Sequence, residues 1–175
     1  MDTDLQRIDV KLLLDTPANP NLDPFLTIFD RWRNVEDHPC DWVDLADYAH
    51  MVKGPGILIA GKRDRYSINL NDPGPGLMTS TQGGLSGDLQ NRFSEAVERA
   101  LQLNETLTSE PEFPAEFKVR NGNWEIFVND RLGFPNDDAT DLLVRPAVAG
   151  AFAVDQSELL RHSDPLGRLG YSLRS

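Results

Sequence analysis

The chain has 175 residues, a formal net charge of −11 and a single cysteine. This length is enough for one domain with a sizeable hydrophobic core. No stretch reaches the roughly 20 apolar residues that a membrane-spanning helix needs. An acidic chain also repels the phosphates of nucleic acids and of anionic lipids. We therefore expect neither a nucleic-acid partner nor a membrane partner.

The first residues and the lone cysteine bear on the compartment. Met1–Arg7 is polar and acidic and lacks the apolar core of a secretory signal peptide. Cys40 has no second cysteine with which to form an internal disulfide, which is typical of proteins in a reducing compartment. These features predict a cytoplasmic protein, in which Cys40 is a small buried hydrophobe or an idle thiol.

The first third of the chain predicts a strand, a helix and a segment that fits both. Ile8–Leu14 alternates between apolar and other residues, which indicates a strand with one buried face. Asp23 and Pro24 are typical of a helix start, and the apolar residues of Phe25–Arg33 follow at helical spacing. Asp41–Met51 fits a helix or a strand. We favour a strand for its first part, because a short run before a turn suits a meander.

Two Gly-Pro-Gly triplets, Gly54-Pro55-Gly56 and Gly74-Pro75-Gly76, bracket the next segment. Proline fixes φ and glycine permits positive φ, so each triplet predicts a chain reversal. Three short apolar runs then predict a three-stranded antiparallel meander. These runs are Ile57–Ala60, Tyr66–Leu70 and Leu77–Thr81.

The following segment predicts a long helix and a hairpin. Leu89–Leu107 carries an apolar stripe at helical spacing, with Glu95 and Arg99 as an i,i+4 ion pair. Asn121-Gly122 lies between two further apolar runs and is the strongest short signal for a hairpin turn.

The C-terminal part completes the predicted fold. Pro135–Asp138 indicates the start of another helix, which Pro146 ends or kinks. Leu169–Leu173 predicts a last short strand, within a tail that we expect to be loosely ordered from about residue 155. The elements together predict a single α+β domain over residues 1–175. It has about six to seven short strands in a mostly antiparallel sheet, packed by about three helices.

The bracketed segment contains a near match to a phosphate-binding loop. Gly56 to Arg63 has the spacing G-x-x-x-x-G-K. Arg63 stands where that motif needs Ser or Thr, and the intervening run is strand-like, so we reject a nucleotide-binding loop. Lys62, Arg63 and Arg65 then form a cationic hairpin tip. The tip is either a contact for an anion or partner, or a solvated turn that discourages edge pairing, and we favour the second interpretation.

A second cluster of polar residues precedes the first triplet. Asp44, Asp47 and His50 have the spacing D-x-x-D-x-x-H. On a helix, these side chains share one face and could hold a metal or transfer protons. On a strand, Asp44 and His50 lie roughly 20 Å apart and Asp47 faces the other way. Because we favour the strand, we expect no metal and no cofactor, and keep Asp47, Tyr48 and His50 as candidate catalytic residues.

A stretch of the chain resembles a family of uncharacterised bacterial proteins. Their sequence of V-A-D-Y-x-H-V, then G-P-G, an apolar strand and a glycine, is similar to Val43–His50 followed by Gly54–Gly61. The Phe25–Trp32 helix resembles their F-x-R-W segment, and the resemblance covers roughly residues 8–145. Members carry His or Glu after the strand glycine, where this chain has Lys62-Arg63. The resemblance implies one domain and brings no activity with it.

Two functions remain open. We favour a non-catalytic binding or assembly module that self-associates or binds an unknown protein partner, because no complete catalytic constellation is present. The alternative is a small enzyme or ligand-binding protein, in which the acids and histidine of Asp44–His50 share a site with Arg63 or Arg65 as an anion anchor. Whether the chain is an enzyme stays open.

Overall fold

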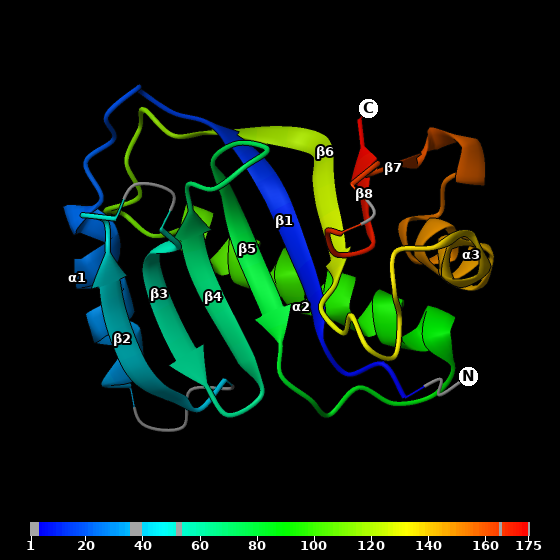
Figure 1. Ribbon diagram of the computed structural model, residues 1–175. Coiled ribbons are helices and arrows are strands. Elements are labelled where there is room, and N and C mark those ends of the chain that lie inside the picture. Colours follow the sequence, from blue (N-terminus) through cyan, green and yellow to red (C-terminus); the bar gives the residue numbers. More distant parts are fainter. Residues whose placement is uncertain (1–3, 36–39, 52–53, 165, 175) are drawn as a thin grey trace.

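The computed structural model describes residues 4–35, 40–51, 54–164 and 166–174. Within them lie three α-helices, which are α1 (Asp23–Arg33), α2 (Leu89–Thr108) and α3 (Asp138–Phe152) (Figure 1). The eight described strands are β1 (Ile8–Asp15), β2 (Trp42–Tyr48), β3 (Gly56–Gly61), β4 (Asp64–Asn69), β5 (Gly76–Thr81), β6 (Lys118–Val128), β7 (Leu160–Arg161) and β8 (Gly170–Leu173). A short 3-10 helix, η1, covers Gln156–Glu158.

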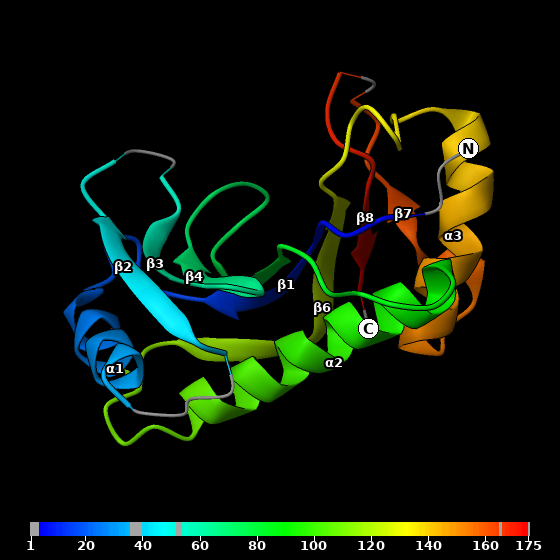
Figure 2. The same ribbon diagram turned by 90° about the horizontal axis from the view of Figure 1, so that it is seen from below.

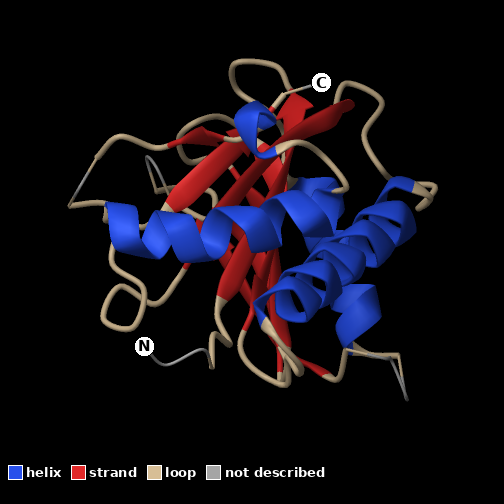
Figure 3. Cartoon of the chain, turned by 90° about the vertical axis from the view of Figure 1, so that its right-hand side faces the viewer, coloured by secondary structure: helices blue, strands red, loops and turns tan. Residues whose placement is uncertain are grey.

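The eight strands form one antiparallel sheet in the order β2-β3-β4-β5-β1-β6-β8-β7. Helix α1 packs on β2 and β3, and α2 packs on β1 and β5. Figure 2 shows both helices on the same side of the sheet. Helix α3 packs against α2, and the strands lie behind the helices when the molecule is seen from that side (Figure 3). The predicted α+β fold is confirmed, with slightly more strands than expected.

Buried apolar side chains between the sheet and its helices form two clusters. One joins α2 and α3 to β1, β6 and β8, and contains Phe93 and Ile126. The other joins α1 to the meander and contains Phe29, Trp32 and Tyr66, with the rings of Trp32 and Tyr66 stacked 6.3 Å apart. The aromatic stripe predicted for the first helix therefore forms much of the second cluster.

Strand β1 is buried on both faces, whereas the alternation in its sequence predicted one buried face. Asp9, Lys11 and Leu13 point away from the helices and are nevertheless covered. The loop before β5 reaches over them, because Lys11 Nζ donates to the Asn71 carbonyl oxygen at 2.8 Å. The loop before β8 also contributes, through an ion pair from Arg168 to Asp9. The burial of this second face depends on two loops that are distant in sequence, so it cannot be predicted from the residues of β1 alone.

The predicted hairpin turn at Asn121-Gly122 is wrong. Strand β6 continues through both residues and pairs with β1 on either side of them. Between Leu12 and Leu14 the pairing partner on β6 moves by five residues, so extra β6 residues form a bulge at the bend in Figure 1. Gly122 has φ of +76°. An Asn-Gly pair tolerates positive φ in a bulge as well as in a turn, and pairing with β1 decides between them.

The C-terminal segment is packed, which corrects the expectation of a loosely ordered tail. Leu159, Leu169 and Tyr171 are buried, and β8 pairs with β6 as the last strand that the sequence predicted. Pro146 does not end α3, which continues to Phe152. The residues after the proline, Ala147–Ala149, pack in the first apolar cluster, and this packing maintains the helix.

Both Gly-Pro-Gly triplets connect strands, as predicted, and β3, β4 and β5 form the predicted meander. The first triplet is the more constrained, because Gly56 has φ of +71° and a Cβ there would lie 2.0 Å from the Ile68 carbonyl oxygen. In the second triplet, nothing lies within 4 Å of such an atom on Gly74, and a Cβ on Gly76 would lie 2.6 Å from the Leu12 carbonyl oxygen. No described helix is long and apolar enough to cross a bilayer.

Candidate functional site

The acids before the first triplet interact with backbone amides of their own segment. Residues 42–48 are a strand, as favoured from the sequence, so Asp44, Asp47 and His50 do not share a helical face. Asp44 Oδ1 accepts a hydrogen bond from the Leu45 amide at 2.9 Å. Asp47 Oδ1 accepts one from the Ala49 amide at 2.8 Å. Since β2 is an edge strand of the sheet, we interpret both carboxylates as protection of this edge against strand addition.

His50 and Asp47 line an open cavity of about 540 Å³ where β3 begins. Part of its wall comes from Asn21, before α1, and from Asp23, the first residue of α1. Tyr48 is exposed. Arg63, one of the predicted anion anchors, lines a different cavity at the other end of β3, and Arg65 lines neither cavity, so the structure does not bring His50 and either arginine into one site. The combined acid, histidine and arginine site is therefore wrong.

The three cations of the hairpin tip also diverge. Lys62 Nζ lies 3.4 Å from a carboxylate oxygen of Asp41. Arg63 turns toward α2, where its Nη2 lies 3.4 Å from Glu95 Oε1. Arg65 lies on β4, one residue before the buried Tyr66, so strand alternation places it on the helix-free face. Three cations that are close in sequence therefore have three different surroundings.

Arg63 lines a cleft between the β3–β4 tip and the flank of α2, which we call the Arg63 cleft. Its volume is about 390 Å³. The lining consists of Cys40, Arg63, Asp64 and the α2 residues Arg99, Gln102, Leu103 and Thr106. Sequence reasoning identified only Arg63 among these as a ligand-binding candidate. The α2 residues were missed because a polar helix flank has the same pattern whether it faces solvent or a cleft.

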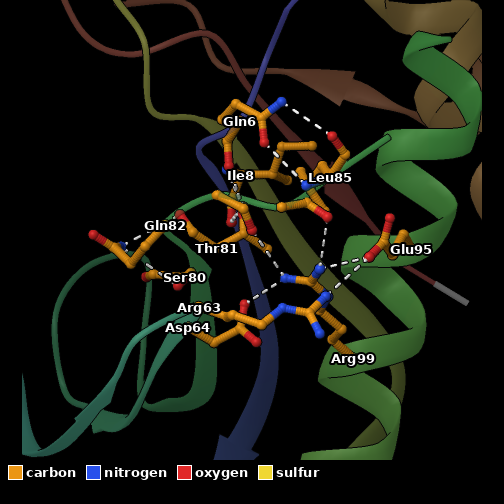
Figure 4. Close-up of polar contacts among 12 residues, drawn as sticks. Gln6, Ile8, Arg63, Asp64, Ser80, Thr81, Gln82, Leu85, Glu95 and Arg99 are labelled. Carbon is orange, nitrogen blue, oxygen red and sulfur yellow. Dashed lines mark hydrogen bonds and ion pairs between the residues drawn. The ribbon is translucent and has the colours of Figure 1, made fainter. Parts of the chain in front are cut away.

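Arg99 also lines the cleft. Figure 4 shows its polar contacts with the residues around it. Its Nη1 donates to Asp64 Oδ1 at 2.9 Å, and its Nη2 donates to Glu95 Oε1 at 2.5 Å. The guanidinium also donates to the carbonyl oxygens of Gly83 and Gly84. Burial raises the pKa of Asp64, while the charge of Arg99 opposes that shift. The predicted Glu95–Arg99 ion pair is confirmed. The Arg99 guanidinium already donates hydrogen bonds to groups of the same chain.

Arg63 differs from Arg99 in its exposure. Its side chain is 57% exposed, and the one ion pair described for it is the long contact to Glu95. A guanidinium has five N–H donors, so most of those of Arg63 face the cleft or solvent. Leu103 gives the same cleft an apolar side, and Gln102 and Thr106 give it polar atoms. The cleft can therefore bind an anion attached to a short apolar body.

The remaining ionisable group of the cleft is unsuited to nucleophilic chemistry. Burial, with a smaller contribution from nearby Asp64, raises the pKa of the Cys40 thiol to about 11. The thiol is protonated at neutral pH, and only the thiolate is a strong nucleophile. This position agrees with the expectation that Cys40 is idle.

A buried polar cluster on the helix-free face was missed by sequence reasoning. Glu125 is fully buried and bonds to Ser172 Oγ at 2.8 Å, to His162 Nε2 at 2.9 Å and to Arg174. Burial opposes its ionisation, but hydrogen bonds from His162, Arg174 and Ser172 hold its pKa below the usual value. A charged residue in an otherwise apolar strand, as in Trp124–Val128, is the signal that could have indicated it.

The Ser172, His162 and Glu125 side chains do not form a catalytic triad. A triad needs the serine and the acid on different nitrogens of the imidazole. Here Ser172 Oγ and Glu125 Oε2 both contact His162 Nε2, at 3.0 and 2.9 Å. Ser172 also donates directly to Glu125. We interpret this cluster as structural.

Comparison with protein-family models, curated proteins and solved structures finds no match to this chain. The resemblance to the bacterial family with its V-A-D-Y-x-H-V segment therefore stays a prediction.

Proposed function

We propose that the chain is a non-catalytic binding module that holds a small organic acid in the Arg63 cleft. This proposal rests on the exposed Arg63 guanidinium, which lines a cavity of about 390 Å³. Small-molecule sites begin at roughly 300 Å³. The single cysteine of the chain supports a cytoplasmic setting for this binding.

A carboxylate can pair with Arg63 at low cost to the protein. Glu95 is 3.4 Å from Arg63 but 2.5 Å from Arg99. An exposed ion pair of the Arg63–Glu95 kind contributes about 0–1 kcal/mol. An incoming carboxylate replaces that contact with two parallel N–H···O bonds, while Glu95 stays with Arg99. The apolar body of the ligand then lies on Leu103, with Gln102 and Thr106 beside it.

The same lining argues against catalysis in this cleft. Cys40 is protonated at neutral pH, because burial raises the pKa of its thiol. Asp64 Oδ1 accepts a hydrogen bond from Arg99 Nη1 at 2.9 Å, so this carboxylate is already paired within the protein. What the cleft offers a ligand is charge, shape and hydrogen bonds, which is the chemistry of binding.

Calorimetric titration with acetate, succinate, citrate and inorganic phosphate at low ionic strength tests this function. We expect one or more of these anions to bind, and Arg63→Ala to weaken binding by about 10- to 100-fold, since a charge-assisted hydrogen bond contributes about 1.5–3 kcal/mol. Lys62→Ala is the matched control, because Lys62 is the adjacent cation, is 72% exposed and lies outside the cleft.

Two results would overturn the assignment. One is that none of the four anions binds at concentrations up to about 10 mM. The other is equal affinity of Arg63→Ala and the wild type. Amide chemical shifts of Gln102 and Thr106 give a second measurement, because an anion that bypasses the cleft leaves them unchanged.

A further inference from the structure

The polar side chains of the Arg63 cleft follow one flank of helix α2. Arg63 turns toward Glu95 and Arg99 of that helix, and its Nη2 lies 3.4 Å from Glu95 Oε1 (Figure 4). Gln102 and Thr106 line the same cleft further along α2. The helix rises by roughly 10 Å between Arg99 and Thr106. The cleft therefore has a cationic end at Arg63 and an uncharged polar end at Thr106.

The stretch between these two ends is apolar. Leu103 lines it and is 6% exposed, so its side chain forms part of the floor. Asp64 is the one carboxylate among the described residues that line the cleft, and it accepts a hydrogen bond from Arg99 at 2.9 Å. A ligand that reaches from one end to the other has to cross Leu103, which favours an unbranched chain of methylene groups.

The polar end offers a ligand one acceptor and one amide. Thr106 Oγ1 donates its hydrogen to the Gln102 carbonyl oxygen at 2.8 Å, so toward a ligand this oxygen acts as an acceptor. The Gln102 side-chain amide forms no hydrogen bond with any residue that the structure describes, and its NH2 group can donate to a ligand. A hydroxyl group suits both partners, because it donates to Thr106 and accepts from Gln102.

Other terminal groups fit this end less well. A second carboxylate has acceptors only, and the Thr106 hydrogen is already used within the helix. An ammonium group has donors only, and the described lining has no carboxylate at this end to offset the desolvation of its charge. A methyl group forms no hydrogen bond with either Gln102 or Thr106.

We propose that the Arg63 cleft selects unbranched carboxylic acids that carry a hydroxyl group on the carbon farthest from the carboxylate. This inference rests on the proposed function, since the carboxylate first has to pair with Arg63. It adds the direction of the bound ligand. The chain lies over Leu103, and the hydroxyl group lies between Gln102 and Thr106.

Calorimetric titration with acids of four and of six carbons, each ending in a methyl, hydroxyl, carboxylate or ammonium group, tests this selectivity. At the length that spans the cleft, we expect the hydroxy acid to bind about 3- to 10-fold more tightly than the other three, which is what one net hydrogen bond contributes.

Thr106→Val keeps the shape of the side chain and removes its acceptor oxygen. We expect this variant to bind the hydroxy acid no more tightly than the methyl-terminated acid, whose own affinity stays unchanged. Thr108→Val is the matched control, because Thr108 Oγ1 donates to the Asn104 carbonyl oxygen at 2.8 Å on the same helix, outside the cleft lining. Thermal unfolding will verify that each variant is folded.

Each other outcome overturns the inference or the function beneath it. Equal affinity for the four terminal groups at both lengths, or a preference for any group except hydroxyl, overturns the selectivity. A hydroxyl preference that survives in Thr106→Val overturns it too. Failure of the proposed function gives a different result, in which no acid binds or Arg63→Ala binds as tightly as the wild type. If both proposals hold, Arg63→Ala weakens the hydroxy acid and the methyl-terminated acid by the same factor, because both carry the carboxylate.

Discussion

A buried lysine makes the stability of this fold depend on pH. Lys11 is 1% exposed in the central strand, and burial lowers its pKa from 10.5 to about 8. Between these two values the unfolded chain holds a proton that the folded chain has released. Stability then rises with pH, because the unfolded state is the one that binds more protons. The substitution Lys11→Met removes this titration and keeps a long apolar side chain in place.

The size of the effect follows from the pKa difference. One pKa unit corresponds to about 1.36 kcal/mol, and pH 9.5 lies about 1.5 units above the folded pKa. From pH 7 to pH 9.5 the free energy of unfolding of the wild type should therefore rise by about 2 kcal/mol relative to Lys11→Met. The variant also loses hydrogen bonds to Asn69 and Asn71. Any change in the strength of these bonds when Lys11 loses its proton is already contained in its folded-state pKa, so it is not counted again.

Urea unfolding, followed by tryptophan fluorescence at pH 7 and pH 9.5, measures this difference. Asn69 Oδ1 keeps the Asn71 amide as a donor at 3.1 Å in the variant, so we expect Lys11→Met to fold. Lys62→Met is the control, because it makes the same substitution at a lysine whose side chain is 72% exposed. If wild type and Lys11→Met respond equally to pH, Lys11 is not desolvated in the folded protein and the reasoning fails.

Two further predictions concern the turn and the sheet edge. Gly56→Ala should cost more than about 2 kcal/mol, because it forces positive φ on alanine and places Cβ 2.0 Å from the Ile68 carbonyl oxygen. Gly74→Ala, which meets open space, should cost less than about 0.5 kcal/mol, and similar urea midpoints for the two variants would contradict this. Replacing both Asp44 and Asp47 by alanine should raise the average mass in light scattering as concentration increases. An unchanged mass would count against their role in protecting the edge.

Local patterns predicted the elements whose packing follows from their own residues. The aromatic spacing of α1, the stripe of α2 and the runs of the meander each encode one buried face, and that face is what the structure buries. The bulge at Asn121-Gly122 is different. Its local signal is the same for a turn and a bulge, and the choice depends on pairing with β1, more than a hundred residues away in sequence.

The candidate sites show the same limit more sharply. Lys62, Arg63 and Arg65 are neighbours in sequence, but the turn and the pleat of β4 direct them to three different surroundings. Arg63 instead shares its cleft with residues of α2. Charge composition indicated that the tip was cationic, but only the packing of α2 against the sheet shows which cation has a cavity in front of it.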